Sequence, residues 1–220
     1  PGRAALMFVT LKLATSLDGR IATAAGESRW ITGPEAREAV HGLRAEHDAV
    51  LVGVETALAD DPELTVRLAG HVGPQPARVV LDSRLRLSPA SKLARTARDI
   101  PTLVVSTQAL SPALTDQGVR VLQVAAAQDG RPALATTLAR LGAEGISRLF
   151  VEGGGQVAAS FLRAGLVDAL EWFRAPLVLG SEGRPGVGAM EITALSEAPR
   201  LKRVDVREVG YDLWERYERI

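Results

Sequence analysis

The sequence predicts an α/β fold organised around a largely parallel sheet. Short apolar runs bounded by charge or glycine, such as 48–53, 78–82 and 148–152, are typical of strands buried on both faces. Segments with helical spacing of apolar residues separate these runs, as expected for helices packed on a parallel sheet. The 220 residues are 46% apolar, which is enough for a sizeable core.

The expected strands and extended segments share either alternating polarity or a short apolar run. In chain order they cover residues 8–14, 48–53, 64–67, 78–82, 102–106, 119–124, 148–152, 169–174, 201–209 and 211–217. Asp18-Gly19 ends the first strand with turn chemistry. The last two strands meet at Gly210, so we expect an antiparallel hairpin at the edge of the sheet.

The expected helices lie between these strands. The first helix ends at about Glu46, and the second covers 55–60. A short helix lies between 106 and 119, and two further helices cover 132–141 and 156–163. Thr32 and Glu35 have the spacing of a capping box at the start of the first helix. Asp61-Pro62 ends the second. A loop rich in glycine and proline at 180–188 is expected to be mobile.

We expect one domain over residues 8–220, preceded by a tail over 1–7 that resembles the end of a linker. No interior segment has the length and composition of a linker between domains. No segment has the features of a signal peptide or a membrane-spanning helix.

Charge and cysteine content narrow the classes of function. Lysine and arginine number 26 and so do aspartate and glutamate, which argues against a general binder of nucleic acid or anionic membranes. The chain has no cysteine, which excludes disulfides, thiolate zinc sites and a cysteine nucleophile and fits a cytoplasmic protein. The histidines lack metal-ligand spacing, so no metal is expected.

A glycine turn, Gly153 to Gly155, follows the strand that ends at Glu152 and precedes a helix. Glycines let backbone amides approach an anion, so this turn is a candidate cradle for a pyrophosphate; the alternative is a tight turn without a ligand. Glu152 is a candidate acid/base or substrate acceptor, or else a cap for the turn. Lys12 is a candidate cation or proton donor, or else lies on the exposed face of an edge strand.

Other candidates are weaker when taken singly. Trp30 lies in a small, polar loop, a composition that often lines a ligand. Arg44 and Arg67 suit a phosphate, although most arginines are solvated surface residues. Thr56 and Asp60, four apart on one helix face, could bind a ribose, or they belong to a helix stop.

Several longer runs occur in a fixed order, at 11–22, 26–32, 52–67, 81–84, 151–154, 165–168 and 176–180. Together they resemble the reductase domain of bacterial riboflavin biosynthesis, 5-amino-6-(5-phosphoribosylamino)uracil reductase. The resemblance covers about Phe8 to Tyr217. It implies a dihydrofolate-reductase-like, three-layer α/β/α fold, NADPH as the hydride donor, a homodimer, and reduction of the substrate's ribosyl group to a ribityl chain.

The resemblance also implies roles for individual residues. Those implied to contact NADPH are Ala14, Trp30, Thr56, Asp60, Ser83, Gly154, Gly155, Gln156, Val157, Ala158, Ala159 and Ser160. Those implied to contact the substrate are Ser28, Arg44, Leu64, Arg67 and Glu152. Arg84 is our addition, as a partner for the 2′-phosphate of NADPH. We expect Lys12 to be the proton donor or electrostatic stabiliser, and Glu152 to orient the substrate.

Bifunctional members of this family carry a zinc deaminase with H-x-E and P-C-x-x-C motifs. A chain without cysteine cannot supply them, so we expect no deaminase activity in this chain. We expect either a standalone reductase or a domain from a longer protein, with the deaminase upstream or separate. Two alternatives stay open: another reductase of this fold acting on a pterin- or pyrimidine-like substrate, and a non-catalytic nucleotide-binding module.

Overall fold

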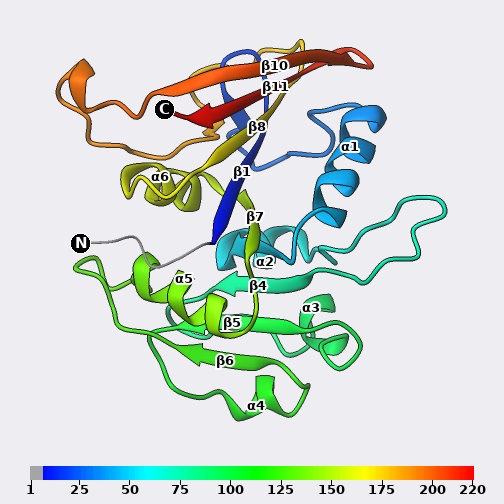
Figure 1. Ribbon diagram of the computed structural model, residues 1–220, viewed down its shortest axis with the longest axis vertical. Coiled ribbons are helices and arrows are strands. Elements are labelled where there is room, and N and C mark those ends of the chain that lie inside the picture. The colour runs from blue at the N-terminus through cyan, green and yellow to red at the C-terminus, as the bar shows by residue number, and fades with distance from the viewer. Residues whose placement is uncertain (1–6) are drawn as a thin grey trace. The chain divides into compact units, whose positions relative to one another are not determined.

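The computed structural model describes residues 7–220, so the expected tail lies outside the described residues except for Met7 (Figure 1). The described chain divides into two compact units. Unit 1 contains residues 7–8 and His41–Phe150, and unit 2 contains Val9–Val40 and Val151–Ile220. The unit boundary at Val40–His41 falls within α1 (Pro34–Ala45), and the boundary at Phe150–Val151 falls within β7 (Arg148–Gly153). The expectation of one reductase domain over 8–220 stays a prediction.

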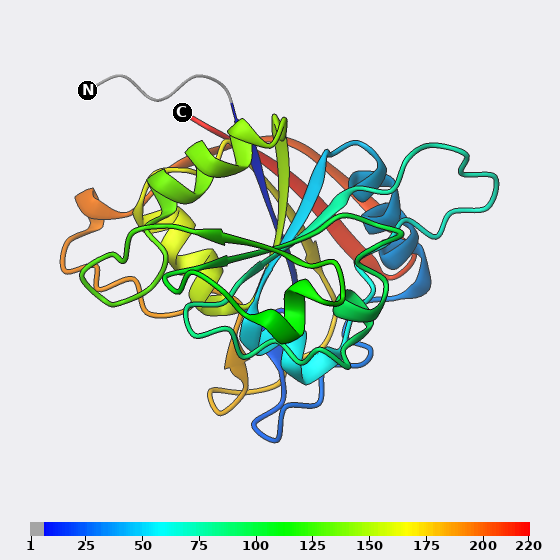
Figure 2. The same cartoon turned by 90° about the horizontal axis from the view of Figure 1, so that it is seen from below.

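Unit 1 contains a parallel sheet whose neighbouring strands follow chain order. These strands are β3 (Ala49–Gly53), β4 (Ala77–Leu81), β5 (Thr102–Ser106) and β6 (Arg120–Gln123). Its helices are α2 (Val54–Asp60), α3 (Lys92–Arg95), α4 (Pro112–Thr115) and α5 (Leu134–Ala143). Figure 2 shows α5 on one side of these strands and α3 and α4 on the other. This is the arrangement that right-handed crossovers give when the chain changes direction across a parallel sheet.

Unit 2 combines parallel and antiparallel pairing. β1 (Phe8–Thr15) pairs in parallel with β8 (Ala169–Arg174). β11 (Asp212–Arg219) pairs antiparallel with β8 and with β10 (Leu201–Val209), as Figure 1 shows. The expected C-terminal hairpin is therefore confirmed, and so is the mostly parallel α/β sheet.

Two short strands and a helix complete the regular elements near the glycine turn of unit 2. β2 (Arg20–Ala22) pairs antiparallel with β9 (Arg184–Pro185) in a separate small sheet. The loop expected at 180–188 therefore contains a strand. α6 covers Gly155–Arg163, and a single 3-10 turn, η1, covers Leu195–Glu197.

Two local expectations are wrong. The first helix begins at Pro34, and the Gly33 carbonyl accepts from the Arg37 amide at 3.2 Å, so Gly33 and not Thr32 is the N-cap. Proline is favoured at the first helical position because it lacks the N–H that would stay unbonded there. The stretch 64–67 forms no strand, and Leu64 has a left-handed φ of 56°.

The side chain of Gln75 takes the place of a neighbouring strand for that stretch. Its Oε1 accepts from the Val66 amide at 2.7 Å, and its Nε2 donates to the Val66 carbonyl at 3.1 Å. Leu64 and Val66 are still buried, at 3% and 5% exposure, while Thr65 and Arg67 are less buried. The apolar alternation of the sequence is thus kept without strand geometry.

Candidate active site

Lys12 lies on an interior strand of unit 2. In strand order β1 lies between β8 and β7, so the edge-strand alternative for Lys12 is wrong. Lys12 is half-buried and shares a sheet face with Ala14, whereas Leu11 and Leu13 are buried on the opposite face. A lysine placed inside a sheet in this way is a candidate for chemistry.

A row of alternating charge starts at Lys12. The register of β1, β8 and β11 places Lys12 opposite Glu171, and Glu171 opposite Arg216. Glu171 is 1% exposed, and its carboxylate accepts from Arg216 Nε and Trp214 Nε1, both at 2.6 Å. Paired residues of neighbouring strands present their side chains on one face, so the Glu171 charge lies next to that of Lys12.

The glycine turn lies at the carboxyl end of β7, directly after half-buried Glu152. Gly153 has a φ of 102°, and Gly154 is the N-cap of α6. A Cβ at Gly155 would lie 2.5 Å from the Pro185 carbonyl oxygen, and the Gly188 amide donates to the Gly155 carbonyl at 2.8 Å. The turn is therefore packed directly against the segment 185–188, and only glycine fits there.

The first turn of α6 is the part that a ligand can reach. Gly154, Gly155 and Val157 are half-buried and Gln156 is exposed. Ala158 and Ala159 are fully buried, so their predicted contact with a cofactor has no accessible side chain to support it. The Ser160 hydroxyl donates to the Gln156 carbonyl at 2.9 Å.

Trp30 is 66% exposed on the segment between β2 and α1. The Arg37 guanidinium lies 4.3 Å from the centroid of its ring, a distance typical of a cation–π contact. Ser28, also a predicted site residue, is half-buried, and its carbonyl accepts from the Ile31 amide at 3.1 Å. Sequence reasoning gave Arg37 no role, and no signal was available, because Trp30 lies before the helix that carries Arg37.

The predicted substrate residues of unit 1 lie on α1 and on the stretch 63–67. Arg44 Nη1 donates to the Thr65 carbonyl at 2.8 Å. Arg67 pairs with Glu63 at 2.9 Å, and the Arg67 side chain is 60% exposed. The left-handed φ of Leu64 is uncommon for a leucine, and such conformations cluster at functional sites.

The predicted nucleotide residues of unit 1 follow β3 and β4. Thr56 and Asp60 lie on α2, and Asp61 caps that helix with a φ of 40°, which confirms the helix stop. Buried Asp82 accepts from the Arg84 amide at 3.3 Å and from the Leu87 amide at 2.8 Å, which shapes the loop carrying Ser83 and Arg84. Within residues 7–220 the exposed Arg84 side chain makes no ion pair, so it can receive an anion.

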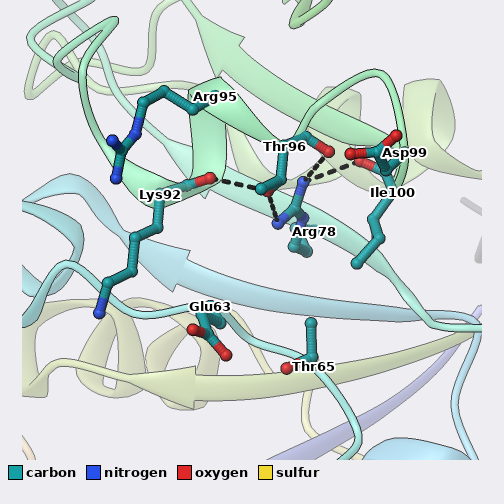
Figure 3. Close-up of a pocket in the computed structure, with 8 residues that line it drawn as sticks. All are labelled: Glu63, Thr65, Arg78, Lys92, Arg95, Thr96, Asp99 and Ile100. Carbon is teal, nitrogen blue, oxygen red and sulfur yellow. Dashed lines mark hydrogen bonds between the residues drawn. The ribbon is translucent and has the colours of Figure 1, made fainter.

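A cavity of about 530 Å³ in unit 1 lies beside the stretch 63–67 (Figure 3). Its lining residues are Glu63, Thr65, Arg78, Lys92, Arg95, Thr96, Asp99 and Ile100. Arg78 is 1% exposed and donates to the carbonyls of Thr96 and Ile100 at 3.0 and 2.8 Å. Burial lowers the pKa of Arg78 to about 10, and the carboxylates of Asp99 and Glu63 oppose that shift. Because Arg78 is bonded to its own surroundings, we interpret it as a structural cation.

The predicted residues thus fall into a set on each unit. Unit 2 carries Lys12, Ala14, Ser28, Trp30, Glu152 and the glycine turn, and unit 1 carries Arg44, Thr56, Asp60, Leu64, Arg67, Ser83 and Arg84. Across the described residues no three His, Asp or Glu side chains have metal-binding geometry. The helices of residues 7–220 are all too short or too polar to cross a membrane.

Comparison with known proteins identifies relatives over most of the chain. Residues 7–214 match the family model described as the RibD C-terminal domain. The riboflavin biosynthesis protein RibD of Aquifex aeolicus is 38% identical over 208 residues, which is 94% of this chain and 56% of that protein. The 2,5-diamino-6-ribosylamino-4(3H)-pyrimidinone 5′-phosphate reductase of Methanothermobacter thermautotrophicus is 37% identical over 212 residues, 96% of this chain and 97% of that protein.

A solved structure of Acinetobacter baumannii RibD, form 2, superposes with a TM-score of 0.82 at 32% identity, covering 97% of this chain and 58% of that one. The match confirms the expected dihydrofolate-reductase-like fold class. This chain spans a little over half the length of these RibD relatives.

Proposed function

Because the chain belongs to the RibD C-terminal domain family, we propose that it is an NADPH-dependent reductase of riboflavin biosynthesis. It reduces the ribosyl group of 5-amino-6-(5-phosphoribosylamino)uracil to the ribitylamino product. The observation that carries the proposal is the archaeal relative of nearly equal length, which is named as the reductase of a closely related pyrimidine. A cytoplasmic location fits such a biosynthetic step.

The glycine turn supports a dinucleotide as the cofactor. Backbone N–H groups at the start of α6 suit a pyrophosphate, and an added Cβ at Gly153 would meet no atom within 4 Å, so space remains on that side of the turn. Arg84, with no ion pair within residues 7–220, suits the 2′-phosphate that distinguishes NADPH from NADH. Bound NADPH supplies the hydride.

Cationic side chains on each unit suit the substrate. Arg44 and Arg67 have the guanidinium geometry that binds a phosphate at two oxygens. Lys12 stabilises or protonates the nitrogen of the ring-opened imine when the neighbouring carbon gains a hydride. Glu152, at the end of the strand next to β1, orients the substrate hydroxyl groups. Trp30 covers the reacting groups and excludes water.

The edge of the unit 2 sheet supports a homodimer. β10 is an edge strand of the described sheet, and Val204 and Val206 on it are 41% and 48% exposed. An unpaired edge with exposed apolar side chains favours pairing with another chain. We propose a second copy of this chain as the partner. The deaminase that supplies the substrate is an upstream domain or a separate protein, since this chain has no cysteine for the zinc site.

A second substrate is favoured by the archaeal relatives, whose names specify the 2-amino pyrimidinone. The two compounds differ in one exocyclic group of the pyrimidine. The test gives the purified protein each compound with NADPH and then with NADH. We expect faster NADPH oxidation with 5-amino-6-(5-phosphoribosylamino)uracil. Faster oxidation with the 2-amino compound would make that compound the substrate. Equal rates with NADPH and NADH would refute the role of Arg84.

A further inference from the structure

We propose that His41 is a positioning residue, which holds the backbone of the stretch 64–67 in the shape that substrate binding requires. The inference rests on the proposed function, since that function places Leu64 and Arg67 against the substrate. His41 lies on α1, four residues before the end of the helix at Ala45. Sequence reasoning gave this histidine no chemistry.

One ring nitrogen of His41 meets two backbone groups of the stretch. His41 Nδ1 lies 3.0 Å from the Thr65 carbonyl oxygen and 3.2 Å from the Arg67 amide nitrogen. The stretch has no strand partner of its own, and Gln75 bonds both backbone groups of Val66 between them. Side chains from two other segments therefore hold two successive peptide units, 65–66 and 66–67.

The other hydrogen-bond partners of Thr65 and Arg67 determine whether Nδ1 of His41 acts as a donor or as an acceptor. A single ring nitrogen cannot donate to Thr65 and accept from Arg67 at the same time. The Thr65 carbonyl already accepts from Arg44 Nη1 at 2.8 Å, whereas His41 is the acceptor that the described residues offer to the Arg67 amide. All three groups are satisfied when Nδ1 carries no proton and accepts from Arg67, with the ring proton on Nε2.

This hydrogen bond fixes the backbone of Arg67, from which the side chain extends. The guanidinium itself is restrained by an exposed ion pair with Glu63, and such pairs hold a side chain weakly. Leu64, three residues earlier, keeps an uncommon left-handed φ that the surrounding contacts must maintain. Without His41, the substrate would have to order this backbone when it binds, which weakens binding but leaves the hydride step unchanged.

The test compares three substitutions of His41. The Asn side-chain oxygen occupies about the place of Nδ1, whereas the Gln side chain reaches the place of Nε2, and Ala reaches neither. We expect His41→Ala and His41→Gln to raise KM about tenfold with kcat nearly unchanged, as for the loss of ordering at roughly one residue. His41→Asn should restore KM, and exchange of the Arg67 amide with solvent should be fast in Ala and Gln but slow in Asn.

A matched control is His71, in the loop that follows the stretch, whose Nε2 has no hydrogen-bond partner among residues 7–220. His71→Ala should leave KM unchanged. An unchanged KM and unchanged Arg67 exchange in His41→Gln would overturn the inference, as would an Asn variant as impaired as Gln. If Arg67→Ala leaves KM unchanged, the proposed substrate role of Arg67 fails instead, and amide exchange still decides the role of His41.

Discussion

Lys12 on β1 lies directly opposite Glu171 on β8, in a parallel register that places a buried carboxylate beside the lysine. Glu171 in turn accepts hydrogen bonds from Arg216 and Trp214 of β11. Lys12 therefore lies in register with a buried carboxylate that is itself paired with Arg216.

Replacing Lys12 with methionine should lower kcat by about 10² to 10⁴, the usual effect of removing a general acid. Methionine keeps much of the length of the side chain and removes the charge, so the fold should persist. Lys202→Met is the matched control. It removes the charge of an exposed lysine on β10, and the strands β11 and β8 lie between β10 and β1 in the sheet. Steady-state rates and thermal unfolding of both variants check this. A Lys12→Met enzyme with near-normal kcat would remove Lys12 from the chemistry.

Gly155→Ala should destabilise the fold by roughly 1–3 kcal/mol through overpacking, and should weaken NADPH binding because the turn is displaced. The added Cβ would lie 2.5 Å from the Pro185 carbonyl, so the turn or the segment 185–188 must move. Gly142→Ala in α5 is the control, because a Cβ there meets nothing within 4 Å. Fluorescence titration with NADPH measures both. Equal affinities in the two variants would show that the turn does not hold the cofactor.

The Asp18 carboxylate makes part of the stability dependent on pH. It accepts from the Ser16 hydroxyl at 2.6 Å and from the amides of Leu179 and Gly180 at 3.1 and 2.7 Å. These bonds, the Ser16 bond above all, lower the pKa of Asp18 from 3.8 to about 2. Since the folded state prefers the charged form, this stabilisation is complete above pH 3.8 and is lost as pH falls towards 2.

Asp18→Asn should therefore be less stable than the original chain at neutral pH, and the difference should shrink as pH falls through that window. Urea unfolding at several pH values measures it. Asp116→Asn, at an exposed helix end, removes a carboxylate elsewhere on the chain and serves as the control. A constant difference between Asp18→Asn and the original chain from neutral to acid pH would contradict the account.

Arg78→Met should destabilise the fold by about 3–5 kcal/mol, as breaking a buried charged network does. The buried guanidinium also donates to Thr96 Oγ1 at 2.7 Å and to Thr102 Oγ1 at 2.6 Å, and methionine can make neither of these bonds. Exposed Arg98 donates to the Asp116 carbonyl at 2.8 Å, so Arg98→Met should cost no more than about 1 kcal/mol. Denaturant unfolding compares the two, and equal losses would argue against a structural role for Arg78.

Apolar runs predicted much of the fold. Strands β5, β8 and β10 have the expected bounds. The first two are largely buried runs, whereas β10 is mostly exposed and ends just before Gly210, where the hairpin turns. Strands β2 and β9 were not foreseen, since three and two residues are too short to display a period. The capping box was wrong because Pro34 sets the helix start by its ring geometry rather than by a side-chain bond.

Less of the site than of the fold could be predicted from the sequence. Glycine turns and arginines can be recognised by type, so the residues of the glycine turn, Arg44 and Arg67 were candidates at once. His41 was not, because its partners are backbone atoms of Thr65 and Arg67, 24 and 26 positions away, and a backbone atom leaves no trace in the pattern of residue types. The left-handed Leu64 was missed for a related reason: the alternation of buried residues persists although no strand forms and Leu64 is left-handed.

The most direct test of the proposed reductase mixes the purified chain with NADPH and 5-amino-6-(5-phosphoribosylamino)uracil, and follows NADPH absorbance together with the pyrimidine product by mass spectrometry. The account predicts oxidation of one NADPH for each ribitylamino product formed, and no product when NADPH is omitted. NADPH oxidation at the background rate, with the substrate recovered unchanged from folded protein, would contradict it.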